Sequence, residues 1–70
     1  MSPDELEELR AHRYWSWWVW EGRARELMAM LDTDPNVDLQ GHGVLLNAAW
    51  EAACRADQKF WQGKREMEES

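Results

Sequence analysis

The stretch that decides the fold is Asp32-Thr33-Asp34-Pro35-Asn36, a dense turn signal near the middle of the 70-residue chain. Asp and Asn side chains hydrogen-bond to the nearby backbone in turns, and Pro cannot continue a helix. Neither side of this stretch contains an alternating, β-branched run of the kind that forms strands. The sequence therefore predicts an all-α fold, an antiparallel two-helix hairpin.

The segment before the turn opens with a helix-capping sequence. Ser2 suits the N-cap, Pro3 suits the first helical position and Glu5 completes a capping box. No strong helix breaker follows until the turn, although Gly22 is a weak helix former. We expect the first helix to run from about residue 3 to residue 31.

The segment after the turn is rich in Ala, Leu, Glu, Gln and Lys, which favour helices. We expect a polar connector over residues 32–42 and a second helix over about residues 43–67. A chain of this size forms one domain, so residues 1–70 are interpreted as a single helical hairpin.

The first helix carries apolar residues on two faces, since successive residues of a helix are rotated by about 100°. The face expected to pack on the second helix comprises Leu6, Leu9, Trp17, Trp20, Ala24, Leu27, Met28 and Leu31. The matching residues of the second helix are Leu46, Ala49, Ala52, Ala53, Ala56, Phe60, Gly63 and Met67. Because large side chains pack against small ones, we expect Trp17 and Trp20 to lie over the alanines.

The opposite face of the first helix has no partner within a hairpin. It comprises Tyr14, Trp15, Trp18, Val19 and Gly22. Aromatic side chains bury roughly 150–250 Å² each, and the largest apolar patch of a typical monomer is only about 300–600 Å². We predict that this face binds a protein partner or another copy of the chain, and that oligomerisation, to a dimer or larger, completes a helical bundle.

Basic residues lie close to the aromatic ones. They are Arg10, Arg13, Arg23 and Arg25, with His42 in the connector. One interpretation pairs the arginines with helix carboxylates one turn away. The other makes these five residues an anion site that holds a phosphate-bearing ligand such as a nucleotide between subunits.

The charge balance argues against direct binding to a nucleic-acid backbone, because the formal net charge is −6 and the pI is about 4.7. An acidic chain of this kind suits mimicry of a nucleic acid instead, an alternative that rests on residues 4–8 and 32–38.

No residue pattern indicates catalysis or metal binding. The two histidines and one cysteine lack zinc-site spacing, and the acidic connector lacks the Gly and Glu that a calcium loop requires. Neither a nucleophile–histidine arrangement nor a phosphate loop is present. We therefore expect no catalytic residue, no metal and no cofactor, and hence no enzyme.

The location follows from the cysteine count and the apolar runs. Cys54 is the only cysteine, which is typical of a reducing compartment. The longest apolar stretch, Trp17 to Trp20, is far shorter than the roughly 20 residues that span a bilayer. The sequence thus predicts a cytoplasmic, non-catalytic interaction protein, such as an adaptor, an assembly factor or a phage- or plasmid-type inhibitor.

Overall fold

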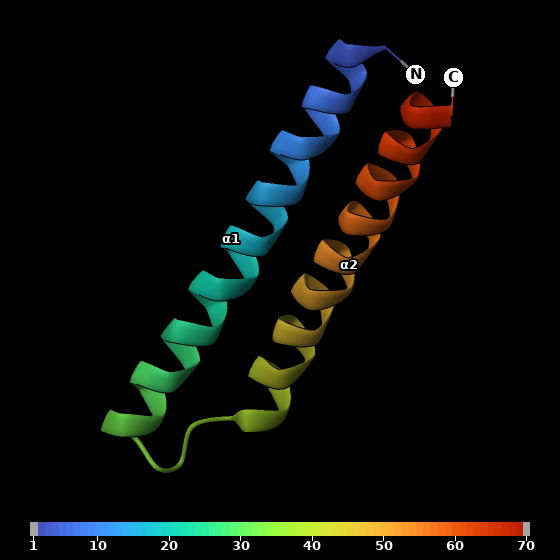
Figure 1. The fold of residues 1–70 in the computed structure, drawn as a ribbon. Coiled ribbons are helices and arrows are strands. Elements are labelled where there is room, and N and C mark those ends of the chain that lie inside the picture. Colours follow the sequence, from blue (N-terminus) through green and yellow to red (C-terminus); the bar gives the residue numbers. More distant parts are fainter. Residues whose placement is uncertain (1, 70) are drawn as a thin grey trace.

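The computed structural model describes residues 2–69 and contains two long helices joined by a short turn (Figure 1). Helix α1 spans Pro3–Thr33 and helix α2 spans Leu39–Glu69. The helices run antiparallel, so that α1 begins and α2 ends at the same end of the molecule (Figure 1). The prediction of an all-α two-helix hairpin is confirmed.

The start of α1 is capped as the sequence indicates. Ser2 is the N-cap, and its Oγ accepts a hydrogen bond of 3.2 Å from the backbone N–H of Glu5. Asp4 and Glu5 lie in the first turn, where the helix dipole favours negative charge. These interactions fix the first turn of the helix.

Helix α1 ends at Thr33, two residues beyond the predicted end. The Thr33 hydroxyl donates to the carbonyl oxygens of Ala29 and Met30 at 3.3 and 3.1 Å. The backbone N–H of Asp34 donates to the Met30 carbonyl at 2.8 Å. Acceptors in the last turn are thereby satisfied, and the helix stops before Pro35.

Helix α2 begins at Leu39, so the predicted connector of 32–42 is too long and the predicted start at residue 43 is wrong. Asp38 provides the cap, because its Oδ1 accepts a 3.1 Å hydrogen bond from the N–H of Gly41. The N–H of His42 also donates to the Asp38 carbonyl at 3.1 Å. Capping thus outweighs the low helix propensity of the two glycines in this turn. The helix extends to Glu69 rather than 67.

Replacing the cap residue of α2 tests this account of the turn. We expect Asp38→Ala to lower the free energy of unfolding by about 1 kcal/mol, because an orphan N–H of the first turn loses its acceptor. Urea unfolding followed by circular dichroism measures the loss. Asp32→Ala is the control: removal of an exposed carboxylate near the α1 C-terminus leaves stability unchanged or slightly higher. Equal effects for the two variants would contradict the capping role.

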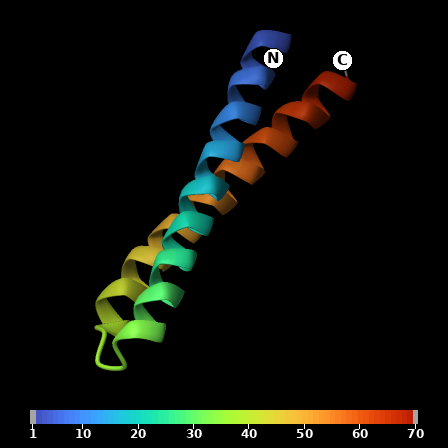
Figure 2. The same ribbon diagram turned by 90° about the vertical axis from the view of Figure 1, so that its left-hand side faces the viewer.

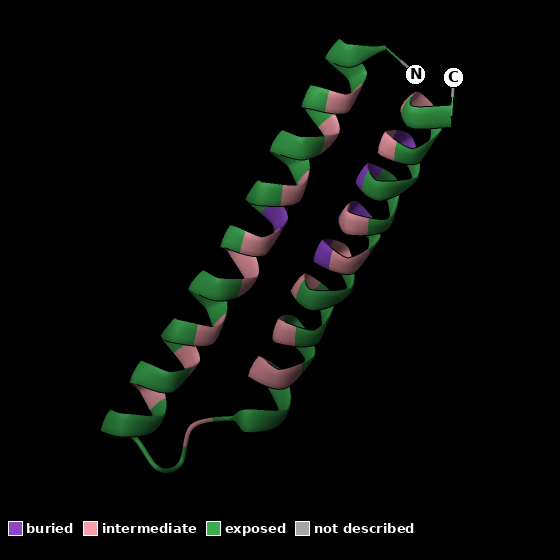
Figure 3. Cartoon of the chain, viewed as in Figure 1, coloured by how far each residue is buried: buried purple, intermediate pink, exposed green. Residues whose placement is uncertain are grey.

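The helices meet along a seam with coiled-coil spacing, and they cross at a shallow angle (Figure 2). On α2 the buried and half-buried residues of the seam are His42, Leu46, Ala49, Ala53, Ala56, Phe60, Gly63 and Met67. On α1 they are Leu6, Leu9, Arg13, Ser16, Trp20, Ala24 and Leu27. Within residues 2–69, full burial is confined to Ser16 and to four positions of α2 between residues 53 and 63 (Figure 3). The core is therefore thin and lies away from the turn.

Two residues predicted to face α2 do not. Met28 is 67% exposed and Leu31 is 40% exposed, whereas Met30 is half-buried. The seam passes through Leu27, and Met28, one position further along, is rotated by about 100° away from it. Leu31 is rotated by only about 40° from Leu27, but it lies in the last turn of α1. Trp17 and Trp20 are half-buried, and Ala53 and Ala56 are buried.

Candidate functional site

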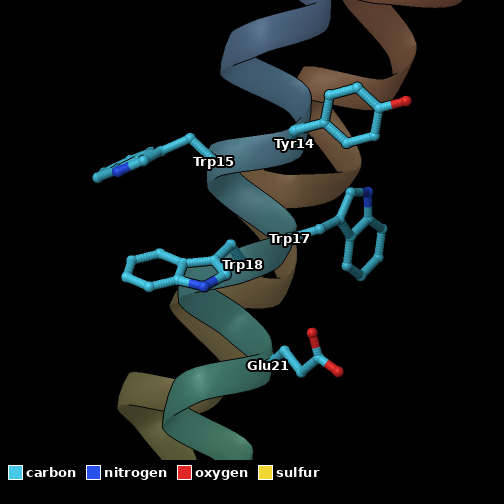
Figure 4. A pocket seen from close by; sticks show the side chains of 5 residues that line it. All are labelled: Tyr14, Trp15, Trp17, Trp18 and Glu21. Atoms are coloured by element: carbon cyan, nitrogen blue, oxygen red, sulfur yellow. The ribbon is translucent and has the colours of Figure 1, made fainter.

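The most unusual surface of the hairpin is the aromatic face of α1, defined by Tyr14, Trp15 and Trp18. These side chains are 63%, 60% and 70% exposed. In Figure 4, α1 lies in front of α2; Trp15 and Trp18 project to one side of α1, and Tyr14, Trp17 and Glu21 project to the other. The predicted outward orientation of these three residues is confirmed for the single chain.

Helical periodicity explains why the rings point outward. The seam residues Arg13, Ser16 and Trp20 are spaced by three and four positions. Trp15 and Trp18 repeat the same spacing two residues further along, a rotation of about 200° around the helix. A helix with two such rows packs one on α2 and leaves the other in solvent.

The other two residues predicted for this interface differ in exposure. Val19 is half-buried, since it lies beside Trp20 at the margin of the seam. Gly22 is exposed, and a Cβ built on it meets nothing within 4 Å. Position 22 therefore has room for a side chain within the single chain.

Two shallow depressions lie on the aromatic face. One, of about 500 Å³, is lined by Tyr14, Trp15, Trp17, Trp18 and Glu21 (Figure 4). The other, of about 400 Å³, is lined by Trp18, Val19, Gly22, Arg23 and Glu26. Trp18 belongs to both, so its indole is the ridge between them. The face thus has both projecting rings and recesses next to them.

The indoles of α1 also contact neighbouring rings. Trp15 stacks on His12, with centroids 6.3 Å apart and an angle of 19° between the ring planes. Trp17, which lines the larger depression, forms an edge-to-face pair with Trp20 at 5.8 Å. The stacking partner restrains Trp15, and a restrained ring loses less conformational freedom on binding.

A polar cluster joins the two helices close to the aromatic face. Asp57 Oδ1 accepts a hydrogen bond from Arg13 Nε at 2.6 Å and another from Trp17 Nε1 at 2.9 Å. The Arg13 and Asp57 side chains are 26% and 28% exposed. Charge-assisted hydrogen bonds are stronger than neutral ones, so this cluster contributes to the register of α1 against α2.

The Arg13 guanidinium also lies among aromatic rings. Its Cζ is 5.5 Å from the ring centroid of Phe60, 5.6 Å from that of Trp61 and 5.8 Å from that of Tyr14. Cation–π attraction supplements the ion pair at these distances. Arg13 lies on the seam of α1, and its partner Asp57 lies one position off the seam of α2, so the sequence pattern does not reveal the pair.

The other residues of the predicted anion site are dispersed. Arg10 pairs with Glu7 at 3.9 Å and Arg25 pairs with Glu21 at 3.0 Å, which confirms pairing with helix carboxylates for these two. Arg10 and Arg25 are separated by 15 residues of α1, or roughly 22 Å along the axis. Arg23 is exposed and His42 is half-buried, beyond the turn on α2. A ligand site assembled from several subunits stays a prediction.

Among residues 2–69, no three His, Cys, Asp or Glu side chains are grouped so that they could hold a metal ion. Within the same range, neither helix combines the length and the apolar character needed to cross a bilayer.

The chain exposes more surface than a compact protein of its mass. Its solvent-accessible area is 5550 Å². A compact monomer of 8.3 kDa exposes about 4600 Å². The excess of about 950 Å² reflects the elongated shape, with extents of 54 × 15 × 12 Å.

Comparison with known proteins identifies no matching family model, no similar curated protein and no similar solved structure.

Proposed function

We propose that this chain is a non-catalytic interaction protein that binds another protein, or a second copy of itself, through the aromatic face of α1. The observation that carries the proposal is the 60–70% exposure of Tyr14, Trp15 and Trp18 on the side of α1 away from α2. Trp and Tyr are the residues most enriched at binding hot spots.

The energetics support a covered face. At these exposures each ring leaves on the order of 100–150 Å² in solvent, which at about 25 cal/mol per Å² corresponds to roughly 3 kcal/mol of burial per ring. Exposed ion pairs such as Arg25–Glu21 contribute only about 0–1 kcal/mol. Burial of the aromatic face therefore supplies more association energy than the exposed ion pairs do.

The compartment in this proposal is the cytoplasm. Cys54 is half-buried and free, and a free thiol as the sole cysteine suits a reducing environment. The formal net charge of the chain is −6. If the partner is another protein, this charge favours encounter with a basic one.

Paired alanine substitutions test the proposal. We expect Trp15→Ala/Trp18→Ala to weaken every association of the chain by about 100-fold or more, because both hot-spot rings are lost. The control is Trp50→Ala/Trp61→Ala, which removes two indoles of α2 that are 48% and 45% exposed. Sedimentation velocity measures self-association. Affinity purification of a tagged chain from the cells that express it measures binding to other proteins. The proposal would be refuted if the double variant on α1 had the same oligomeric mass in solution as the unmodified chain and bound the same proteins.

A further inference from the structure

We infer that the aromatic face is covered by a second copy of the chain, with the two α1 helices packed antiparallel about a twofold axis. This inference rests on the proposed function and names the partner. It predicts a four-helix dimer in which α1 lies between its own α2 and the α1 of the second copy.

The sequence of the exposed row of α1 is the first support. Its residues, alternately three and four positions apart, are Glu8, Ala11, Trp15, Trp18, Gly22 and Arg25. All six are exposed in the single chain. This spacing is the one that two helices need in order to pack along each other.

The row is symmetric about the midpoint between Ser16 and Trp17. In an antiparallel pair, Trp15 of one copy therefore lies opposite Trp18 of the other. Ala11 lies opposite Gly22, two small residues beside the four central indoles. Large residues at the centre with small ones on both sides give the interdigitation that a packed interface requires.

Charge complementarity favours the antiparallel direction. Antiparallel packing places Glu8 of one copy opposite Arg25 of the other at both ends of the row. Parallel packing would instead place Glu8 opposite Glu8 and Arg25 opposite Arg25, which are like charges. At the edge of the row, Tyr14 and Glu21 face each other across the antiparallel interface, a phenol donor and a carboxylate acceptor. Arg25 and Glu21 pair with each other within one chain at 3.0 Å, and because both side chains are exposed they can also be contacted by the second copy. Arg13 pairs with Asp57 and lies on the seam side.

The depression beside Gly22 also fits an antiparallel dimer. The depression beside Gly22 has a volume of about 400 Å³ and is next to the Trp18 ridge. Since position 22 has no side chain, this recess is open to the indole of Trp15 from the second copy.

Disulfide trapping tests the direction and the contact. In a Cys54→Ala background, chains carrying Ala11→Cys and chains carrying Gly22→Cys are mixed and oxidised mildly. We expect a disulfide between the two kinds of chain. Self-linked dimers of either kind are not expected, because their thiol-bearing positions are 11 residues apart along the paired axes. That is about 16 Å, beyond the roughly 7 Å that Cα atoms of a disulfide allow.

The single substitution Gly22→Glu tests the recess. It fits the single chain, where a Cβ meets nothing, but buries a charge in the dimer. We expect the dimer Kd to rise by about 100-fold or more, and the matched control Gly43→Glu, also without a contact to its Cβ, to leave the Kd nearly unchanged.

The outcomes separate this inference from the proposed function. A monomeric mass by light scattering, or self-linked rather than mixed disulfides, overturns the antiparallel dimer. If the monomer still captures another protein and the Trp15→Ala/Trp18→Ala variant does not, the proposed function stands without the dimer. If that variant changes neither mass nor capture, both fail.

Discussion

Phe60→Ala is expected to lower the free energy of unfolding by about 3–5 kcal/mol. Phe60 is 4% exposed and is the one large side chain in the buried core, which otherwise consists of Ser16, Ala53, Ala56 and Gly63. It packs edge-to-face on Trp61 at 5.1 Å and lies under the Arg13 guanidinium. The other buried residues of the core are Ser, Ala and Gly, which are too small to fill the space left by the ring.

Such a loss is severe because small domains have little stability in reserve. Urea unfolding followed by far-ultraviolet circular dichroism gives the change in midpoint, at one fixed chain concentration so that association contributes equally. Met28→Ala is the control, since Met28 is 67% exposed and its truncation is expected to cost about 0.5 kcal/mol or less. Similar midpoints for the two variants would show that the core is not centred on Phe60.

Asp57→Ala is expected to cost about 2 kcal/mol, because Arg13 and Trp17 lose their shared acceptor. Removing one partner of a fully buried ion pair costs about 3–5 kcal/mol. The side chains of Arg13 and Asp57 are about a quarter exposed, so water replaces part of the lost interaction. Asp57→Asn is expected to cost less, since its amide oxygen still accepts from the Trp17 indole.

A double-mutant cycle isolates the interaction between Arg13 and Asp57. Alanine is introduced at each position and at both, and the coupling energy is taken from urea unfolding. The reference cycle uses Arg25 and Glu21, whose side chains are 77% and 56% exposed, with an expected coupling of about 0.3–0.5 kcal/mol. A coupling for the inter-helix pair no larger than this reference would mean that it does not fix the helix register.

Sequence reasoning predicts the hairpin and its exposed ring face because both depend on local signals. The turn around Pro35 and the cap at Ser2 act over a few residues, and helical periodicity alone separates Trp15 and Trp18 from the seam. The start of α2 was missed because two glycines argue against a helix there. The helix nevertheless begins at Leu39, because Asp38 caps it through its hydrogen bond from the N–H of Gly41.

The inter-helix cluster was beyond sequence reasoning for a different reason. Arg13 on the seam signals that a charged partner or an opening is needed, but not which carboxylate supplies it. The choice of Asp57 depends on how α1 and α2 are shifted along each other, and that shift is set by all of the seam contacts together. The same shift places the Phe60 ring under the Arg13 guanidinium. Cation–π attraction to this ring stabilises a positive charge that would otherwise be unfavourable in the seam.

The antiparallel course of α1 and α2 has a consequence for how the protein would present anything attached to it. Because α1 begins and α2 ends at one end of a body 54 Å long, segments joined to either helix emerge together, far from the turn. In an antiparallel dimer the two copies would point these ends in opposite directions. The assembly would then act as a rigid spacer that holds two identical attachments roughly a molecular length apart, a geometry suited to bridging two sites at once.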